Sequence, residues 1–177
     1  MVDRPQFMRD VIADTWYPAK DLPVILERKE NLKGIEIGVS HGGTTHYLLE
    51  SLPNSHIIGI DPYEVYSQMF DTEQSFETFK KLMKLYPDRI TFIQSTSDEA
   101  VDKIEDESVD FIFVDGYHSN EQVKKDIENY YSKLKSGGLM SGHDYTGWSL
   151  QPSVDEKAAD YGKTVLTCES DCWYWWK

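Results

Sequence analysis

Between Lys33 and Gly142 the chain alternates short apolar stretches with stretches of helical periodicity. The apolar stretches predicted to be strands are Gly34–Gly38, His56–Asp61, Arg89–Gln94, Val109–Asp115 and Gly138–Gly142. The stretches predicted to be helices are Thr44–Ser51, Glu73–Tyr86, Asp98–Ile104 and Asn120–Leu134. Nearly continuous apolar strands separated by helices are typical of a parallel sheet covered by helices on both faces. The alternation therefore predicts an α/β fold built on a doubly wound sheet.

The C-terminal part of the chain follows a different pattern. Ser153–Tyr161 has helical periodicity, and Lys163–Cys168 and Cys172–Trp176 are two further strands separated by only a few residues. Parallel neighbours need a long crossover, so these two strands should form an antiparallel hairpin. The prediction is then a sheet of seven strands, mostly parallel, with an antiparallel C-terminal hairpin strand. In that last strand the aromatic residues should alternate between the two sheet faces as core.

The first 32 residues are expected to form one or two short helices. Their apolar residues at helical spacing are Phe7, Met8, Val11, Ile12 and Trp16, followed after Pro18 by Leu22, Val24, Ile25 and Leu26. These helices could be a lid over a substrate site or a cap on the sheet edge. We expect 1–177 to be a single domain, with 1–32 as this lid or cap and 33–177 as the ligand-binding core.

Charge and composition restrict the partners. The formal net charge is −13, and no lysine or arginine cluster is longer than a pair, so long nucleic acids are not expected to bind. No run approaches the ~18 apolar residues of a membrane span, and the N-terminus lacks the apolar core of a signal peptide. A cytoplasmic location without a membrane partner is the expectation. Cys168 and Cys172, the two cysteines, are too few for a cysteine-only zinc site and are expected to be buried thiols, although they could face each other across the hairpin.

Polar residues follow all five predicted parallel strands. These ends are the loop from Gly38, Asp61, Ser95–Ser97, Asp115–His118 and His143–Asp144. In an open parallel sheet ligands bind beyond the carboxyl ends of the strands. Five suitable ends at one edge therefore predict a binding site there.

The first of these ends is a glycine-rich loop that leads into a helix. Such a loop lets the backbone approach a ligand, and the free N–H groups of the helix start face it. Asp61 lies about 20 residues past the loop, where nucleotide-binding folds place an acid on ribose hydroxyls. The spacing Gly38-x-x-x-Gly42-Gly43 departs from the G-x-G-x-x-G of dinucleotide folds, and Ser40 stands at the second glycine position. This spacing favours a cofactor with an amino-acid end over one with a pyrophosphate.

Three motifs together resemble a known family. They are residues 36–44 (Glu-Ile-Gly-Val-Ser-His-Gly-Gly-Thr), residues 113–118 (Phe-Val-Asp-Gly-Tyr-His) and residues 137–144 (Gly-Gly-Leu-Met-Ser-Gly-His-Asp), with Asp61 between the first two. From about Lys33 to Lys177 the chain resembles class I S-adenosylmethionine-dependent methyltransferases, which have a Rossmann-like sheet. Within that class it is similar to the small O-methyltransferases of the metal-dependent branch.

The resemblance implies a cofactor site. Gly38, Gly42 and the loop around them, including Ser40 and Thr44, would hold the methionine part of S-adenosyl-L-methionine, with Glu36 supporting the loop. Asp61 would bind the ribose. Ser95, Thr96 and Ser97 would lie near the adenine, and Tyr63 could pack against it. Asp115 would stand where the cofactor site meets the reaction centre.

The resemblance also implies a divalent metal, magnesium or manganese, at the ends of the fourth and fifth strands. Asp115 and Asp144 match the positions of its ligands, and His143 stands where many relatives carry another acid. A hard cation could chelate an acceptor hydroxyl and lower its pKa. His118, three residues past Asp115, could take the proton. Because imidazole suits manganese better than magnesium, His143 could instead be a second base or a substrate contact.

These residues predict an S-adenosylmethionine-dependent O-methyltransferase that acts on a hydroxyl of a small molecule or sugar. One rival is an NAD-linked oxidoreductase of similar fold, which the glycine spacing disfavours. The other is a non-catalytic S-adenosylmethionine-binding module, which would not require Asp115, His118 and Asp144 together. The chain has little sequence between strands for a specificity insertion, so a homodimer in which the partner completes the pocket is a further hypothesis.

Overall fold

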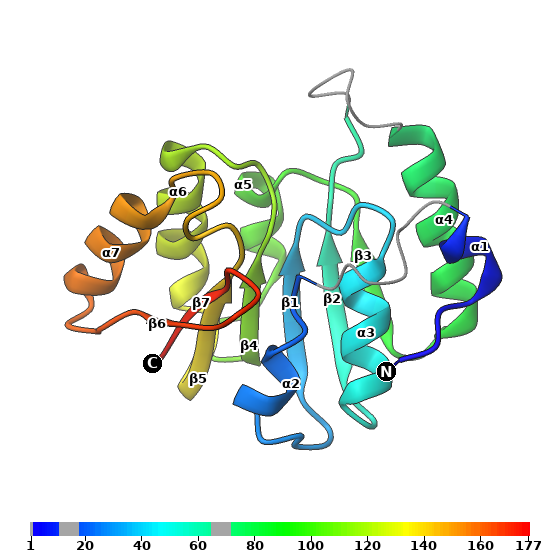
Figure 1. Cartoon of the computed structure of the whole chain (residues 1–177), viewed down its shortest axis with the longest axis horizontal. Coiled ribbons are helices and arrows are strands. Elements are labelled where there is room, and N and C mark those ends of the chain that lie inside the picture. Colours follow the sequence, from blue (N-terminus) through cyan, green and yellow to red (C-terminus); the bar gives the residue numbers. More distant parts are fainter. Residues whose placement is uncertain (1, 11–17, 65–71) are drawn as a thin grey trace.

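A seven-stranded sheet forms the centre of the molecule (Figure 1). The computed structural model describes residues 2–10, 18–64 and 72–177. The strand order is β3-β2-β1-β4-β5-β7-β6. All neighbours from β3 to β5 are parallel, whereas β7 lies between β5 and β6 and is antiparallel to both. The predicted doubly wound sheet and its inserted antiparallel strand are confirmed.

The elements follow one another in the predicted alternation. The strands are β1 Lys33–Ile37, β2 His56–Ile60, β3 Ile90–Ile93, β4 Val109–Val114, β5 Leu134–Gly142, β6 Leu166–Thr167 and β7 Trp173–Trp176. The helices are α1 Gln6–Arg9, α2 Leu22–Ile25, α3 Gly43–Ser51, α4 Thr72–Leu85, α5 Ser97–Ala100, α6 Asn120–Tyr131 and α7 Gln151–Asp160. A 3₁₀ turn, Val101–Lys103, follows α5 and divides the helix predicted for Asp98–Ile104.

Helices cover both faces of the sheet (Figure 1). Alternate residues of each strand point to opposite faces, so apolar strand residues pack against helices on both sides. On one face Ile35, Ile112 and Met140 pack with buried residues of α6 and α7. On the other face Phe111 and Leu139 pack with the leucines of α2 and α3. The sheet therefore lies between two apolar layers.

The boundary between α6 and β5 differs from the prediction. A helix was predicted to run to Leu134, but α6 ends at Tyr131 and Leu134 begins β5, paired with Val109. Gly137 precedes the predicted strand start at Gly138 but lies inside β5, where its φ of 73° accompanies a register shift between Val109 and Phe111. The glycines thus allow an irregular strand to continue.

The N-terminal segments pack on helices α3 and α4. Met8 of α1 packs with Phe79 and Leu82 of α4, and Leu22 belongs to the cluster around α3. The predicted helical residues Val11, Ile12 and Trp16 lie outside the described residues, so the lid remains a prediction.

Two smaller predictions concern the C-terminal hairpin. Trp173 and Trp175 are buried on one face, and Tyr174 packs toward the other, as expected for a core strand. Both cysteines are free thiols; Cys172 is buried and Cys168 is half-buried. Among the described helices, none has the length and apolar character that a membrane crossing requires.

Candidate active site

The loop after β1 brings its backbone against the end of β4. Gly38 has a φ of 87°, and a Cβ at this position would lie 2.1 Å from the carbonyl oxygen of Asp115. Gly42 has a φ of 81°, and a Cβ there would meet the side chains of Leu82 and Phe79. Both positions therefore require glycine, for conformation and for space. Ser40 also has a positive φ, of 50°, and is exposed.

Asp61 fixes this loop from the end of β2. One carboxylate oxygen accepts hydrogen bonds from the backbone N–H groups of Val39 (3.0 Å) and Ser40 (2.9 Å). The other accepts from the N–H of Tyr63 at 2.8 Å. A carboxylate has about four acceptor positions, so capacity remains for ribose hydroxyls. In the described structure Asp61 holds the loop itself in shape.

Glu36 lies in β1 just below the loop and is buried. Thr45 of α3 donates a hydrogen bond from its hydroxyl to the Glu36 carboxyl group. Burial raises the pKa of Glu36 well above its ordinary value, and the charges of Asp115 and Asp61 raise it further, against the effect of Thr45. Glu36 thus ties the strand to the start of α3, as its supporting role predicts.

The residues predicted for the adenine side have clear local contacts. Thr96 caps α5 by accepting a hydrogen bond from the N–H of Glu99 at 3.3 Å. Ser97 donates to Asp126 at 2.6 Å, and Ser95 donates to Glu99 at 3.0 Å.

Tyr63 belongs to an aromatic cluster beside these residues. Its ring stacks on Phe76 with centroids 4.5 Å apart, and its hydroxyl donates to the carbonyl oxygen of Ser40 at 2.5 Å. Burial raises its pKa above the ordinary value. The ring is fixed by protein contacts and leaves only part of its surface to a ligand.

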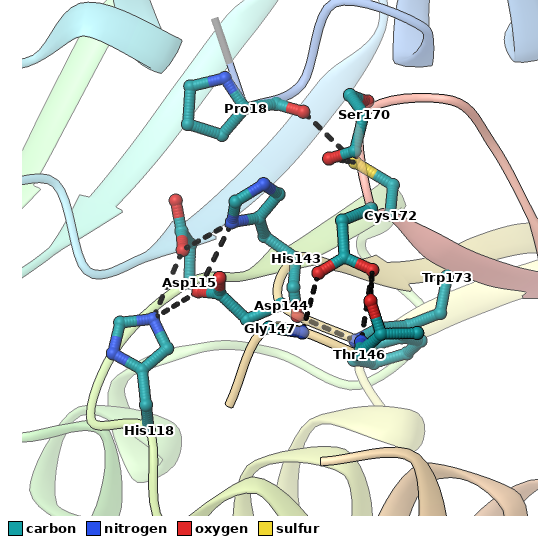
Figure 2. A network of polar contacts seen from close by, with 11 residues as sticks. Pro18, Asp115, His118, His143, Asp144, Thr146, Gly147, Ser170, Cys172 and Trp173 are labelled. Atoms are coloured by element: carbon teal, nitrogen blue, oxygen red, sulfur yellow. Dashed lines mark hydrogen bonds and ion pairs between the residues drawn. The ribbon is translucent and has the colours of Figure 1, made fainter. Parts of the chain in front are cut away.

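Two acids and two histidines meet beyond β4 and β5 (Figure 2). Nε2 of His118 lies 2.7 Å from Oδ2 of Asp144 and 3.5 Å from Oδ1 of Asp115. Nδ1 of His143 lies 3.1 Å from the same oxygen of Asp144 and 3.7 Å from that of Asp115. These four residues were predicted to lie at one edge of the sheet, and in the structure their side chains contact one another.

The charges in this cluster shift one another's pKa. Burial lowers the pKa of His118, but its hydrogen bonds to Asp115 and Asp144 and their charges prevail and raise it to about 9. Burial likewise opposes a rise in the pKa of His143, which its bond to Asp144 produces. Burial raises the pKa of Asp115, whereas the two histidines hold that of Asp144 well below its usual range. Without another cation present, His118 is positively charged near neutral pH.

A metal ion fits three of these residues by geometry and donor type. Asp115, His118 and Asp144 each offer one ligand atom, and these atoms lie within 4.8 Å of one another. Two carboxylate oxygens with one imidazole nitrogen suit manganese, iron or zinc, and a magnesium ion less well. His118, which was predicted as a base, is thus the residue that could complete a metal site with Asp115 and Asp144. His143, predicted as a ligand, stands behind Asp144 and carries the hydrogen bond from Nε1 of Trp173 on its carbonyl oxygen, at 3.1 Å.

The loop that carries Asp144 is held by Asp171, in the turn between β6 and β7. Oδ1 of Asp171 accepts from the N–H (2.9 Å) and the hydroxyl (2.7 Å) of Thr146. Oδ2 accepts from the N–H of Gly147 at 2.8 Å, and the carbonyl oxygen accepts from the N–H of Tyr145 at 3.1 Å. The C-terminal hairpin therefore fixes the position of the loop that carries Asp144.

One cavity of about 810 Å³ connects the glycine loop with the acid–histidine cluster. The predicted site residues that line it are Glu36, Gly38, Ser40, Thr44, Asp61, Tyr63, Thr96, Ser97, Asp115, His118 and Asp144. Gly42, Ser95 and His143 stand behind this wall. Pro18 lines it too, near the acid–histidine cluster.

The cavity also includes residues that the sequence analysis did not single out. His41, Ser75 and Gln122 line it, and His41 contacts the Ser75 hydroxyl at 3.2 Å. Gln122 donates to Ser97 (3.2 Å), so the first turn of α6 contributes to the adenine side. Polar residues at helix starts are common on any surface, which is why no sequence signal distinguished these. Asp171 is equally inconspicuous, since turn aspartates are frequent.

Comparison with known proteins agrees with this arrangement. Residues 35–145, more than half of the chain, match a family model described as a methyltransferase domain. An uncharacterized protein, R132, of Acanthamoeba polyphaga mimivirus is 29% identical over 140 residues, covering 75% of this chain and 62% of that protein. The chain thus spans less than two thirds of that relative.

Two solved structures share the fold. A SAM-dependent methyltransferase from Aquifex aeolicus has 17% identity and a TM-score of 0.63, with 99% of this chain and 98% of that chain covered. A SAM-dependent O-methyltransferase from Thermotoga maritima has 16% identity and a TM-score of 0.64, covering 88% of this chain and 56% of that chain.

Fold and site together define a class, the methyltransferase domains built on a Rossmann-like sheet. The chain belongs to the methyltransferase family whose model covers residues 35–145.

Proposed function

We propose that the protein is an O-methyltransferase that moves the methyl group of S-adenosylmethionine to a hydroxyl of a small molecule or sugar, with a divalent metal at the reaction centre. The observation that carries this proposal is the single cavity in which the loop at Gly38 and Asp61 opens onto Asp115, His118 and Asp144. The O-methyltransferase from Thermotoga maritima, similar in fold, supports transfer to oxygen.

The cofactor would lie along the glycine loop. The sulfonium of S-adenosylmethionine supplies an activated methyl group. Asp61 would hold the ribose while keeping the loop closed around it, and Thr96 and Ser97 would border the adenine. Glu36 would keep β1 and the start of α3 together beneath the methionine end. Held in this way, the sulfonium would face the ends of β4 and β5.

The acceptor would be held by the cluster at those strand ends. A divalent ion on Asp115, His118 and Asp144 would supply Lewis acidity that lowers the pKa of an acceptor hydroxyl. Asp115 and Asp144 orient the hydroxyl toward the cofactor, and such positioning is worth orders of magnitude in rate. His143 steadies Asp144 from behind. Without the ion, Asp115 and Asp144 keep His118 protonated near neutral pH, so His118 could take the proton of the hydroxyl only after it has lost its own.

Binding of Mn²⁺ tests the cluster before any acceptor is known. Protein saturated with S-adenosylhomocysteine is titrated with Mn²⁺, and the bound ion is followed by electron paramagnetic resonance. Asp115→Ala and Asp144→Ala should each lose Mn²⁺ binding while S-adenosylhomocysteine affinity stays within about threefold, because one of two charged ligands is missing. Asp102→Ala, an exposed acid outside the cavity, is the control. Undiminished Mn²⁺ affinity in both site variants would remove the metal from the proposal.

A further inference from the structure

The two cysteines of the chain lie opposite each other at the base of the C-terminal hairpin. Thr167 of β6 pairs with Trp173 of β7, and the next opposed position in this antiparallel register holds the two cysteines. The backbone N–H of Cys168 donates to the carbonyl oxygen of Cys172 at 3.1 Å. Residues opposite each other in a hydrogen-bonded antiparallel pair have Cα atoms about 5.5 Å apart, and a disulfide bond spans about 4.4–6.8 Å between Cα atoms. The backbone of the hairpin therefore suits a disulfide bond.

The turn between the cysteines keeps them in this register. Residues 169–171 connect them, and the last of these, Asp171, has a φ of 58°. A three-residue hairpin loop commonly ends in this left-handed conformation, which returns the chain to its partner strand. Both cysteine side chains pack with the apolar cluster on the α2 and α3 face of the sheet. The two thiols are thus on the same face as well as opposite each other.

The surroundings of the two thiols differ. The Ser170 hydroxyl lies 3.6 Å from the sulfur of Cys168 and 3.3 Å from that of Cys172. A hydrogen bond between the thiols lowers the pKa of Cys168, and the same bond together with burial raises the pKa of Cys172. Cys168 is half-buried, whereas Cys172 is buried. Because the thiolate is the reactive form, Cys168 is the thiol that a reagent in solution meets first.

Cys172 connects the hairpin to the wall of the cavity (Figure 2). Its thiol donates a hydrogen bond to the carbonyl oxygen of Pro18 at 3.0 Å, and Pro18 lines the cavity. Its neighbours in sequence, Asp171 and Trp173, both hold the loop after β5 through hydrogen bonds. A reaction that removes the thiol hydrogen of Cys172 therefore removes a contact of the cavity wall.

We propose that Cys168 and Cys172 are a redox-modification site, at which a small-molecule disulfide such as oxidised glutathione forms a disulfide bond across the hairpin. The Cys168 thiolate attacks one sulfur of the small disulfide, forms a mixed disulfide and releases the other half as a thiolate. Cys172 then loses its proton and attacks the Cys168 sulfur, which releases the second half. The cysteines are thereby oxidised, and the small disulfide is reduced to thiols that take up the protons of both cysteines.

Intact-protein mass spectrometry after equilibration in a buffer of reduced and oxidised glutathione tests the site. Thiols that remain free are alkylated with iodoacetamide before the measurement. Wild type should resist alkylation and be lighter by two hydrogen atoms, because the mixed disulfide resolves internally. The equilibrium constant for closure should be at least about tenfold higher in the native protein than in urea, since opposed thiols lose no further chain entropy on bonding.

Single substitutions separate the roles of the two thiols. Cys172→Ser should stop at the mixed disulfide and carry one glutathione on Cys168, because no second thiol is present. Cys168→Ser should react with oxidised glutathione at least about tenfold more slowly than Cys172→Ser, because its remaining thiol is buried and bonded to Pro18. Serine keeps a hydroxyl at each position, so the two variants are matched in size and polarity.

The inference is overturned if native wild type keeps both thiols, if it accumulates glutathione without closing the disulfide, or if closure is no more favourable than in urea. Equal reaction rates of the two serine variants would overturn the order of attack. None of these measurements depends on S-adenosylhomocysteine or a metal, so the proposed function and this inference can fail separately.

Discussion

Gly38 is the residue at which the cofactor loop touches the catalytic strand. Gly38→Ala adds a methyl group 2.1 Å from the Asp115 carbonyl oxygen at a φ of 87°, so the backbone of one strand end must move. We expect a loss of at least about 3 kcal/mol in the free energy of unfolding, measured by urea denaturation.

Gly137 provides the matched control for this change. It has a φ of 73°, but a Cβ there would meet nothing within 4 Å. Gly137→Ala should therefore cost only the strain of the left-handed backbone, about 1–2 kcal/mol. Similar losses for the two variants would show that close packing against Asp115 is unimportant.

Asp126 predicts a pH dependence of stability. Burial raises its pKa to about 6, partly offset by hydrogen bonds from Ser97 and Gln122. Between about pH 4 and pH 6 the folded state therefore binds more protons at this site than the unfolded state, so its contribution to stability falls as the pH rises.

Asp126→Asn removes this loss. Relative to wild type, the variant should gain about 3 kcal/mol of unfolding free energy between pH 4 and pH 7, from the pKa difference of about 2 units. Asp102→Asn, at an exposed position of the turn after α5, should follow wild type. Parallel stability curves for Asp126→Asn and wild type would contradict the raised pKa.

Single residues of the site were predictable where they end a strand. Asp61 and Asp115 directly follow apolar strands, Asp144 lies two residues past β5, and the carboxyl ends of parallel strands share one edge. Side-chain detail was not predictable in the same way. Which of the two histidines could complete a metal cluster with Asp115 and Asp144 depends on loop dihedrals, such as the φ of 57° at Asp144, that no local pattern encodes.

At the scale of elements, the loop between β5 and α7 depends on the β6–β7 turn. Asp171→Ala removes the acceptors for Thr146 and Gly147 and should loosen the loop that carries Asp144. If the cluster binds a metal as proposed, the affinity for Mn²⁺ should fall about tenfold, because a ligand must be ordered on binding.

Glu169→Ala is the control for that change, since Glu169 lies in the same turn and makes only an exposed ion pair with Lys20 at 3.9 Å. Mn²⁺ affinity is read by calorimetry in the presence of S-adenosylhomocysteine. Equal Mn²⁺ affinity in Asp171→Ala and wild type would mean that the clamp does not position Asp144.

Element type was predictable from periodicity, whereas some boundaries were not. The apolar positions of α6 continue in helical register to Leu134, although the helix ends at Tyr131. The helix ends earlier because Leu134 pairs with Val109 in the sheet, and Val109 lies 25 residues away in sequence. Tertiary pairing here overrides the local pattern.

At the scale of the whole molecule, the sheet brings five strand ends to one edge, and the C-terminal hairpin locks that edge from the side of β5 (Figure 1). The proposed cofactor half of the cavity comes from the loops after β1, β2 and β3, and the proposed reaction half from those after β4 and β5. The proposal therefore predicts that cofactor binding and chemistry are separable by mutation.

The central claim is that this cavity binds S-adenosylmethionine, and thermal unfolding of the purified protein tests it most directly. S-adenosylhomocysteine at about 100 times its dissociation constant should add about 2.7 kcal/mol to the unfolding free energy, seen as a raised Tm. NAD at the same concentration should leave the Tm unchanged, because the loop lacks the glycine spacing for a pyrophosphate. Stabilisation by NAD, with no effect of S-adenosylhomocysteine, would contradict the account.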